Sequence, residues 1–173
     1  LPHNNLGIHY CHNGDYRMGL QYLEKAIDLD SENPDYKYNL AQIYLINWPA
    51  VQEVHKWDKK KVYYEAMKLS KKAAELDPED YELLQDYAVN FFAAENFEVE
   101  ADWEVAAKAW QQARTKALRN DQVFFTWLNE ARVLARKPDF ARALTCLDEA
   151  LKLEPGSDVV KKLRSEVQAK LAQ

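Results

Sequence analysis

The sequence predicts an all-α fold of stacked antiparallel helix hairpins, and three observations predict it. Only 4 of the 173 residues are Gly and 6 are Pro, so long stretches contain no helix breaker. Apolar residues recur at i, i+3, i+4 and i+7, which is the spacing of a helix with one buried face. A set of small and large residues also recurs four times along the chain. Because 47% of the residues are hydrophobic, such a stack can bury a core.

Each of the four copies consists of a first segment, a turn and a second segment. The first segments read Leu6-Gly7-x-x-Tyr10, Leu40-Ala41-x-x-Tyr44, Tyr87-Ala88-x-x-Phe91 and Ala131-x-x-Leu134. The second segments centre on the alanines Ala26, Ala73, Ala113 and Ala150. Hairpin turns are expected at Gly14-Asp15 and at Pro138-Asp139. Pro34, Pro78 and Pro155 lie between hairpins. A proline can start or end a helix there without removing a hydrogen bond that the helix needs.

These residues resemble the tetratricopeptide repeat family over nearly the whole chain. The family builds helix–turn–helix units of about 34 residues, in which small residues let paired helices approach closely. The resemblance implies a right-handed superhelical solenoid, a single array over 1–173, with repeats at about 1–33, 34–80, 81–121 and 122–156. Residues 157–172 are expected to form a capping helix whose apolar face holds Val160, Leu163, Val167 and Leu171. The chain is expected to be a fragment of a longer protein.

The spacing departs from about 34 residues in several places. The largest excess lies in the second hairpin, where an inserted arm spans 47–62 and carries Trp48 and Trp57. These two rings either pack the arm onto its neighbour or present an apolar patch to a partner. Lysines make this arm basic and acidic residues cluster at 95–104, so the two segments are expected to attract each other. In the fourth copy, Glu130 stands where a large apolar residue is expected.

Composition argues against several classes of protein. The net charge of −5 and the pI near 5.4 argue against a nucleic-acid-binding surface, which needs Lys and Arg to neutralise phosphates. No apolar run approaches the roughly 20 residues of a membrane span. Cys11 and Cys146 show no paired spacing and are interpreted as small buried thiols. The compartment stays open, with the cytoplasm slightly favoured over the periplasm or another compartment.

No residue pattern predicts catalysis, a cofactor or a metal centre. His9, Cys11 and His12 form the one cluster of metal-ligand types, but residues two apart on a helix point about 200° apart. His9 and His12 can share a face, yet two ligands make a weak site. There is no Gly-rich phosphate loop, and no nucleophile stands in a known catalytic context. The chain is therefore expected not to be an enzyme and to need no cofactor.

The resemblance also implies a binding surface, because the first helices of this family line a concave groove that holds a peptide or a partner helix. The residues implied in this role are Asn5, Ile8, His12, Tyr38, Asn39, Gln42, Gln85, Asp86, Val89, Phe92, Asn129, Arg132 and Arg136. Their side-chain amides can bind a peptide backbone of any sequence. Arg132 and Arg136 favour an acidic portion of the partner near the fourth repeat, whereas Asp86 favours a basic portion at the centre.

The predicted function is therefore a non-catalytic protein–protein interaction scaffold that binds a peptide or protein segment of unknown identity. One alternative is a self-assembly module, in which the amino-terminal end or the inserted arm docks onto another copy to form a homo-oligomer. Another alternative is a regulatory segment of a larger enzyme. Light scattering across a concentration series distinguishes self-assembly from groove binding, since a groove binder stays monomeric.

Overall fold

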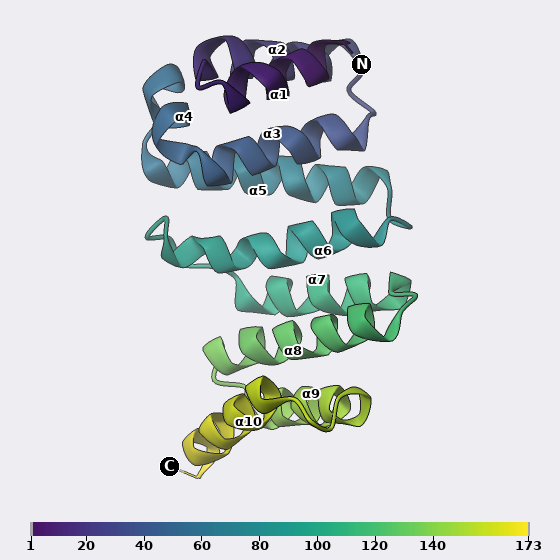
Figure 1. Cartoon of the computed structure of the whole chain (residues 1–173). Helices are drawn as coiled ribbons and strands as arrows, with labels where there is room; N and C mark the ends of the chain where they lie inside the picture. The colour runs from purple at the N-terminus through teal and green to yellow at the C-terminus, as the bar shows by residue number, and fades with distance from the viewer. Residues whose placement is uncertain (1, 173) are drawn as a thin grey trace. The chain divides into compact units, whose positions relative to one another are not determined.

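The computed structural model describes residues 2–172 and confirms an all-α fold (Figure 1). Within that range there are ten α-helices, one 3-10 helix and no strand. The helices are α1 (Pro2–His12), α2 (Tyr16–Leu29), α3 (Pro34–Ile46), α4 (Trp48–His55), α5 (Lys59–Leu76), α6 (Tyr81–Asn90), η1 (Phe91–Glu95), α7 (Trp103–Lys116), α8 (Asn120–Arg136), α9 (Phe140–Leu153) and α10 (Asp158–Leu171). The long helices pack in pairs, α1 with α2, α3 with α5, α6 with α7 and α8 with α9, as expected for helix hairpins.

The described chain divides into two compact units. The first unit holds residues 2–78 together with Phe92–Glu100, and the second unit holds Glu79–Phe91 together with 101–172. Helices α1 to α5 therefore belong to the first unit, and α6 to α10 belong to the second. The expected single array over 1–173 stays a prediction, and its end residues Leu1 and Gln173 lie outside the described residues.

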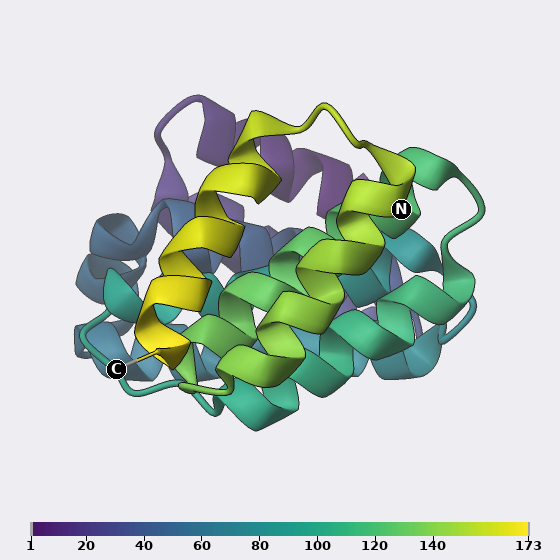
Figure 2. The same cartoon turned by 90° about the horizontal axis from the view of Figure 1, so that it is seen from below.

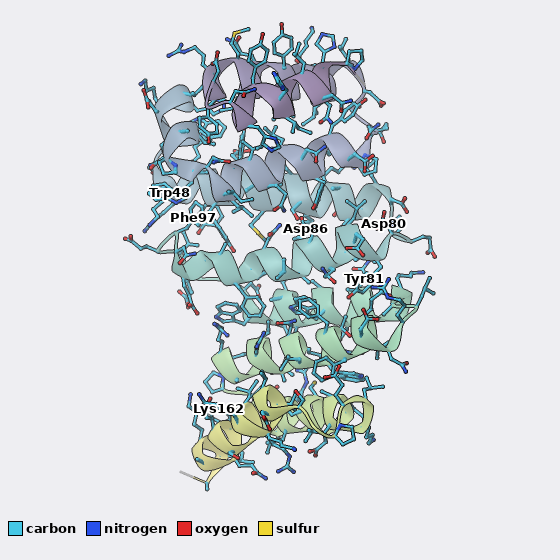
Figure 3. All side chains as sticks on the ribbon, viewed as in Figure 1. Trp48, Asp80, Tyr81, Asp86, Phe97 and Lys162 are labelled. Atoms are coloured by element: carbon cyan, nitrogen blue, oxygen red, sulfur yellow. The ribbon has the colours of Figure 1, made fainter. Side chains whose placement is uncertain are left out.

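Several helices begin where a side chain binds the free backbone N–H groups of the first turn. The carboxylate of Asp80, labelled at the start of α6 in Figure 3, accepts from the backbone N–H of Glu82 at 2.7 Å. Aspartate caps of the same kind stand before four further helices, at Asp15, Asp58, Asp102 and Asp139. Before α8, Gln122 Oε1 instead accepts from the backbone N–H groups of Leu118 and Arg119, at 2.9 and 3.1 Å. These helix starts are therefore encoded locally in the sequence.

The α1–α2 hairpin of the first unit is held by the close approach of two backbones. A Cβ atom added at Gly7 would lie 2.7 Å from Leu23 Cγ and 2.9 Å from the carbonyl oxygen of Gly19. A Cβ atom added at Gly19 would lie 2.3 Å from the Sγ atom of Cys11. Neither position can accept a side chain unless its neighbours shift. Gly14, with φ +84°, supplies the left-handed conformation of the expected turn.

The inserted arm forms a separate short helix rather than an extension of the second hairpin. α3 ends at Ile46, and α4 begins directly after Asn47 (Figure 1). The Nδ2 atom of Asn47 donates to the hydroxyl of Tyr16 on α2 at 2.8 Å. α4 ends where Lys56 takes a left-handed conformation with φ 58°. The insertion therefore folds back against α2, α3 and α5.

The two tryptophans of the insertion pack within the first unit, which is one of the two expected outcomes. The Trp57 ring stacks on His55 with 4.2 Å between ring centroids. The Trp48 ring meets Phe97 edge-on at 6.0 Å, and both residues are labelled in Figure 3. Both tryptophan side chains are half-buried, so neither forms an open apolar patch by itself.

Residues 92–100 complete the core of the first unit. Phe97 is 2% exposed and its ring lies 5.6 Å from that of Tyr63 on α5. Beside it, Lys59 Nζ and Glu98 Oε1 form an ion pair at 3.2 Å. This pair is one contact of the kind expected between the basic arm and the acidic segment, whereas Glu104 of that segment pairs with Lys137 instead.

Glu130 lies on α8, where the sequence pattern calls for a large apolar residue. Its side chain is 3% exposed and accepts from Gln111 Nε2 at 2.6 Å and from Arg114 Nη1 at 2.5 Å. The Arg114 guanidinium in turn lies 3.4 Å from the centre of the Trp127 ring. The buried carboxylate is tolerated because both of its oxygens have donors. A polar network therefore replaces the expected apolar contact between α7 and α8.

The last helix, α10, packs beside α9 in the second unit (Figure 2). Val160 and Val167 are buried, as expected for its apolar face. Leu171, expected on the same face, is 53% exposed because it is the last residue of the helix. Val159 is also exposed, at 54%, so α10 carries apolar surface on more than one side.

Candidate partner-binding surface

Two pockets lie along the second unit, each between alternate helices of the chain. The first has a volume of about 410 Å³ and lies between α6 and α8. The second has a volume of about 340 Å³ and lies between α8 and α10. Helices α6, α8 and α10 therefore form a row with one hollow on either side of α8.

The first pocket combines aromatic rings, amides and charges. It is lined by Tyr81, Glu82, Gln85, Arg119, Asp121, Gln122, Phe124 and Phe125. The Tyr81 hydroxyl donates to the carbonyl oxygen of Gln122 at 3.5 Å. Burial, and to a lesser extent the nearby Glu82 carboxylate, raises the pKa of Tyr81 to about 12. The phenol therefore keeps its proton at neutral pH and stays a hydrogen-bond donor.

Charge at the rim of the first pocket is set by three side chains. Arg119 donates to Asp121 through two hydrogen bonds, at 3.0 and 3.1 Å. This contact lowers the pKa of the Asp121 carboxyl and raises the pKa of the Arg119 guanidinium. Because these two charges cancel, Glu82 leaves the rim with a net negative charge.

The second pocket combines two cations and one carboxylate with apolar surface, so cations are in excess. It is lined by Arg132, Val159, Lys162, Leu163 and Glu166. The Nη1 atom of Arg132 donates to Asn129 Oδ1 at 3.0 Å, which fixes the guanidinium on α8. Burial, followed by the charge of Arg136, lowers the pKa of Arg132. This pocket suits a carboxylate that stands next to an apolar group.

The sequence-predicted residues of the second unit fall at different places along this row. Gln85 lies in the first pocket and Arg132 in the second. Asp86 and Val89 are half-buried on α6, and Asp86 accepts from Asn90 Nδ2 at 2.9 Å (Figure 3). Arg136 is exposed at the end of α8 and donates to the carbonyl oxygen of Arg132 at 3.4 Å.

Asn129 corrects one expectation. The groove assignment requires an exposed amide, but Asn129 is 2% exposed. Its Nδ2 atom donates to the carbonyl oxygen of Phe125 at 2.8 Å, and its Oδ1 atom accepts from Arg132. The side chain therefore orients Arg132 and offers no group to a partner.

The remaining predicted residues belong to the first unit. On α1, Asn5 and His12 are exposed and Ile8 is half-buried. On α3, Tyr38, Asn39 and Gln42 are all half-buried. Asn39 Nδ2 donates to Asn4 Oδ1 at 3.2 Å, so this amide links α3 to α1. Phe92 lies in η1 and also belongs to the first unit, unlike Gln85, Asp86 and Val89.

Sequence reasoning missed the contribution of α10 to this surface. The sequence pattern predicted only the role of a cap for this helix, with Leu163 on the apolar face and Lys162 and Glu166 on the face toward water, yet these three residues line the second pocket. The signal was present in the repeat, because α10 follows a complete hairpin and takes the place of the next first helix. Its exposed side therefore continues the row of α6 and α8.

The described residues hold neither a cluster of metal ligands nor a helix suited to a membrane. Between residues 2 and 172, no three His, Cys, Asp or Glu side chains are grouped so as to hold a metal ion. His9 Nε2 lies 3.1 Å from Asn13 Nδ2, while Cys11 is buried, and burial raises the pKa of its thiol to about 11. None of the described helices has the length and apolar character needed to cross a membrane.

Comparison with known proteins identifies the repeat and the fold. Residues 3–33 match the family model of the tetratricopeptide repeat. A search of curated proteins finds no match. Among solved structures, pilF of Pseudomonas aeruginosa is similar with a TM-score of 0.63 and 18% identity, over 99% of this chain and 68% of that chain. PilW, a widely conserved type IV pilus biogenesis factor, is similar with a TM-score of 0.62 and 19% sequence identity, over 99% of this chain and 69% of the PilW chain. MamA is similar with a TM-score of 0.66 and 16% sequence identity, over 98% of this chain and 86% of the MamA chain.

Proposed function

We propose that this chain, whose residues 3–33 match the tetratricopeptide repeat and whose fold resembles that of pilF, is a non-catalytic scaffold that binds a peptide segment of a protein partner along α6, α8 and α10. The fold is one used generally for protein–protein interaction. The observation that carries the proposal is the pair of pockets on either side of α8. Two hollows along one row suit an extended segment that places a side chain in each.

The linings indicate the chemistry of the segment. Phe124 and Phe125 favour an apolar or aromatic side chain in the first pocket, and the Gln85 amide can bind the peptide backbone beside it. Glu82 favours a basic residue at the same place. Arg132 and Lys162 favour an acidic residue in the second pocket. The segment is therefore basic and apolar at one end and acidic at the other.

The first unit carries a separate set of polar groups on α1 and α3. Asn5 and His12 are exposed to a partner, and Gln42 is half-buried. We assign these residues the same role within their own unit, as a secondary contact surface.

A peptide library displayed on phage tests the proposal, since it samples many sequences at once and requires no named partner. Selected peptides should carry a basic residue and an apolar or aromatic residue at one end and an acidic residue at the other. Replacing Gln85 by Ala should weaken their binding about tenfold, and the double variant Arg132→Glu/Lys162→Glu should weaken it further. The measurement is isothermal titration calorimetry with the selected peptides.

A matched double variant controls for the change of net charge. Lys161→Glu/Lys170→Glu alters two exposed cations of α10 that do not line the pocket. It should bind the peptides as the unaltered chain does. Equal loss of affinity in both double variants, or no loss in either, would rule out the two-pocket surface.

A further inference from the structure

A third pocket lies inside the first unit and contains none of the residues predicted to bind a partner. It has a volume of about 270 Å³ and lies among α2, α3 and α5. Each of these helices contributes residues three, four or seven apart, so one face of each is turned toward the hollow. The apolar part of the lining is Ile27 of α2, Leu40 of α3 and Leu69 of α5.

One end of this pocket is acidic. The Tyr44 hydroxyl donates to Glu24 Oε1 at 3.2 Å. Burial, followed by the Glu24 carboxylate and, more weakly, by Glu65, raises the pKa of Tyr44. Both carboxylates therefore lie within electrostatic reach of the same phenol. His55 of α4 stands behind them, with its Nε2 atom 3.1 Å from Glu24 Oε1.

The other end is basic. Lys37 is 6% exposed, and its ammonium donates to the carbonyl oxygen of Ser31. Burial lowers the pKa of Lys37; the Glu32 carboxylate opposes this shift, and the Lys72 ammonium adds to it. Lys68 stands one turn before Lys72 on α5, and both side chains are exposed. Neither has an ion-pair partner among residues 2–172, so their charges are available to a ligand.

The distance between the two ends selects the size of the ligand. Glu65 and Lys72 are two helical turns apart on α5, which is about 10 Å at 1.5 Å per residue. An extended peptide advances about 3.3–3.6 Å per residue, so three residues span the same distance. A free amino acid is too short, because it carries both of its charges on one carbon atom. A fatty acid fits poorly, because its apolar tail would end against two carboxylates.

We propose that this pocket binds a short peptide of about three residues with free amino and carboxyl ends and an apolar middle side chain. The ammonium of the peptide lies between Glu24 and Glu65, and its carboxylate lies between Lys68 and Lys72. The middle side chain packs on Ile27, Leu40 and Leu69. Asp28, also in the lining, is placed to accept from a backbone N–H of the peptide.

The structure supplies its own reporter for this site. A peptide ammonium at Glu24 shares that carboxylate with His55, whose ring is stacked on Trp57 at 4.2 Å. Binding should therefore shift the NMR signal of the Trp57 indole N–H, which a Trp57→Phe variant identifies. The tryptophans of the second unit serve as internal references.

The probe is the tripeptide Ala-Leu-Ala, titrated into the full chain. The Trp57 signal should shift and reach half-saturation at about 1 mM or below. Acetylating the amino end or amidating the carboxyl end removes one charge-assisted contact and should weaken binding about tenfold each. Leu-Ala, which cannot reach both ends, should bind more weakly than the tripeptide.

Two double variants of equal charge change complete the test. Lys68→Glu/Lys72→Glu alters exposed side chains, leaves the helices intact by circular dichroism and should abolish the shift. Lys25→Glu/Lys60→Glu lies on α2 and α5 outside the pocket and should leave it unchanged. The absence of a Trp57 shift up to about 10 mM, or equal affinity for the free and capped peptides, would overturn the proposal.

Discussion

The α1–α2 contact of the first unit and the α7–α8 contact of the second unit bring helices together in opposite ways. At the first contact, Gly7 and Gly19 have no side chains, and the two backbones touch. At the second, Glu130 fills the contact with a carboxylate that Gln111 and Arg114 satisfy. Two neighbouring helices of this fold can therefore be held together either by the absence of side chains at the contact or by a complete polar network between them.

The two solutions differ in what they tolerate. A contact between backbones has no room for an added methyl group, but it loses little if a nearby surface side chain is shortened. A buried ion pair is instead sensitive to the shortening of one of its side chains, because the charge that loses its partner remains out of water. Three measurements can break or sharpen this contrast.

The largest effect is expected from removing one partner of the buried pair. Arg114→Met leaves the Glu130 carboxylate, 3% exposed, without its cation. The free energy of unfolding should fall by about 3–5 kcal/mol, measured by urea denaturation. The double variant Arg114→Met/Glu130→Leu should recover most of this loss, since no charge is then buried. If the single variant loses less than about 1 kcal/mol, the network does not hold α7 to α8.

An intermediate effect is expected from adding one methyl group to the other contact. In Gly7→Ala the new Cβ meets Leu23 Cγ and two backbone atoms at less than 3.0 Å. Overpacking should cost about 1–3 kcal/mol, although alanine is the better helix former. Gly156→Ala is the matched control, because nothing lies within 4 Å of its added atom. A Gly7→Ala protein as stable as the control would show that α1 and α2 can move apart freely.

The smallest effect is expected at high pH, because a buried thiol lies beside each contact, Cys11 on α1 and Cys146 on α9 next to Glu130. Burial, followed by Asp15, raises the pKa of Cys11 to about 11, and burial, followed by Glu130, raises that of Cys146 to about 12. Both values lie above the ordinary thiol value of 9.0, so folding opposes ionisation. The stabilisation is complete below pH 9 and is lost as the pH rises toward 11 or 12.

Urea midpoints measured between about pH 8 and 11 check this prediction. The midpoint should stay level at first and then fall. Cys146→Ala and Cys11→Ala should each flatten the fall relative to the unaltered chain, since each variant removes one group whose pKa is raised on folding. Tyr44 and Tyr81, whose pKa values are also raised, make the urea midpoint fall with pH by the same amount in both variants. A fall as steep in both variants as in the unaltered chain would mean that the thiols do not report on their contacts.

The sequence predicts the hairpins well because their signals are local. Turn residues such as Gly14 and capping residues such as Asp80 act within a few positions of themselves. The inserted arm was recognised as an insertion, but its folding back on α2 was not predicted. That outcome depends on the bond between Asn47 and Tyr16, which are far apart in the chain.

The candidate surface was harder to predict, because its residues acquire their roles from other helices. Glu130 reads as a misfit until Arg114 of the preceding helix is placed beside it. Asn129 reads as an exposed amide until its bonds to Phe125 and Arg132 bury it. Gln85 and Arg132 are found in pockets, yet each pocket needs residues of a second helix that no spacing rule supplies.

The division of the chain has a practical consequence for work with shortened versions of the protein. The first unit draws on residues 2–78 and on Phe92–Glu100, so the polypeptide changes unit after Pro78, Phe91 and Glu100. A gene fragment that stops at Pro78 would omit Phe97 and leave the rings of Trp48 and Tyr63 without their neighbour. No single cut yields both units whole. A truncation intended to preserve the first unit should therefore end after Glu100 and carry α6 with it.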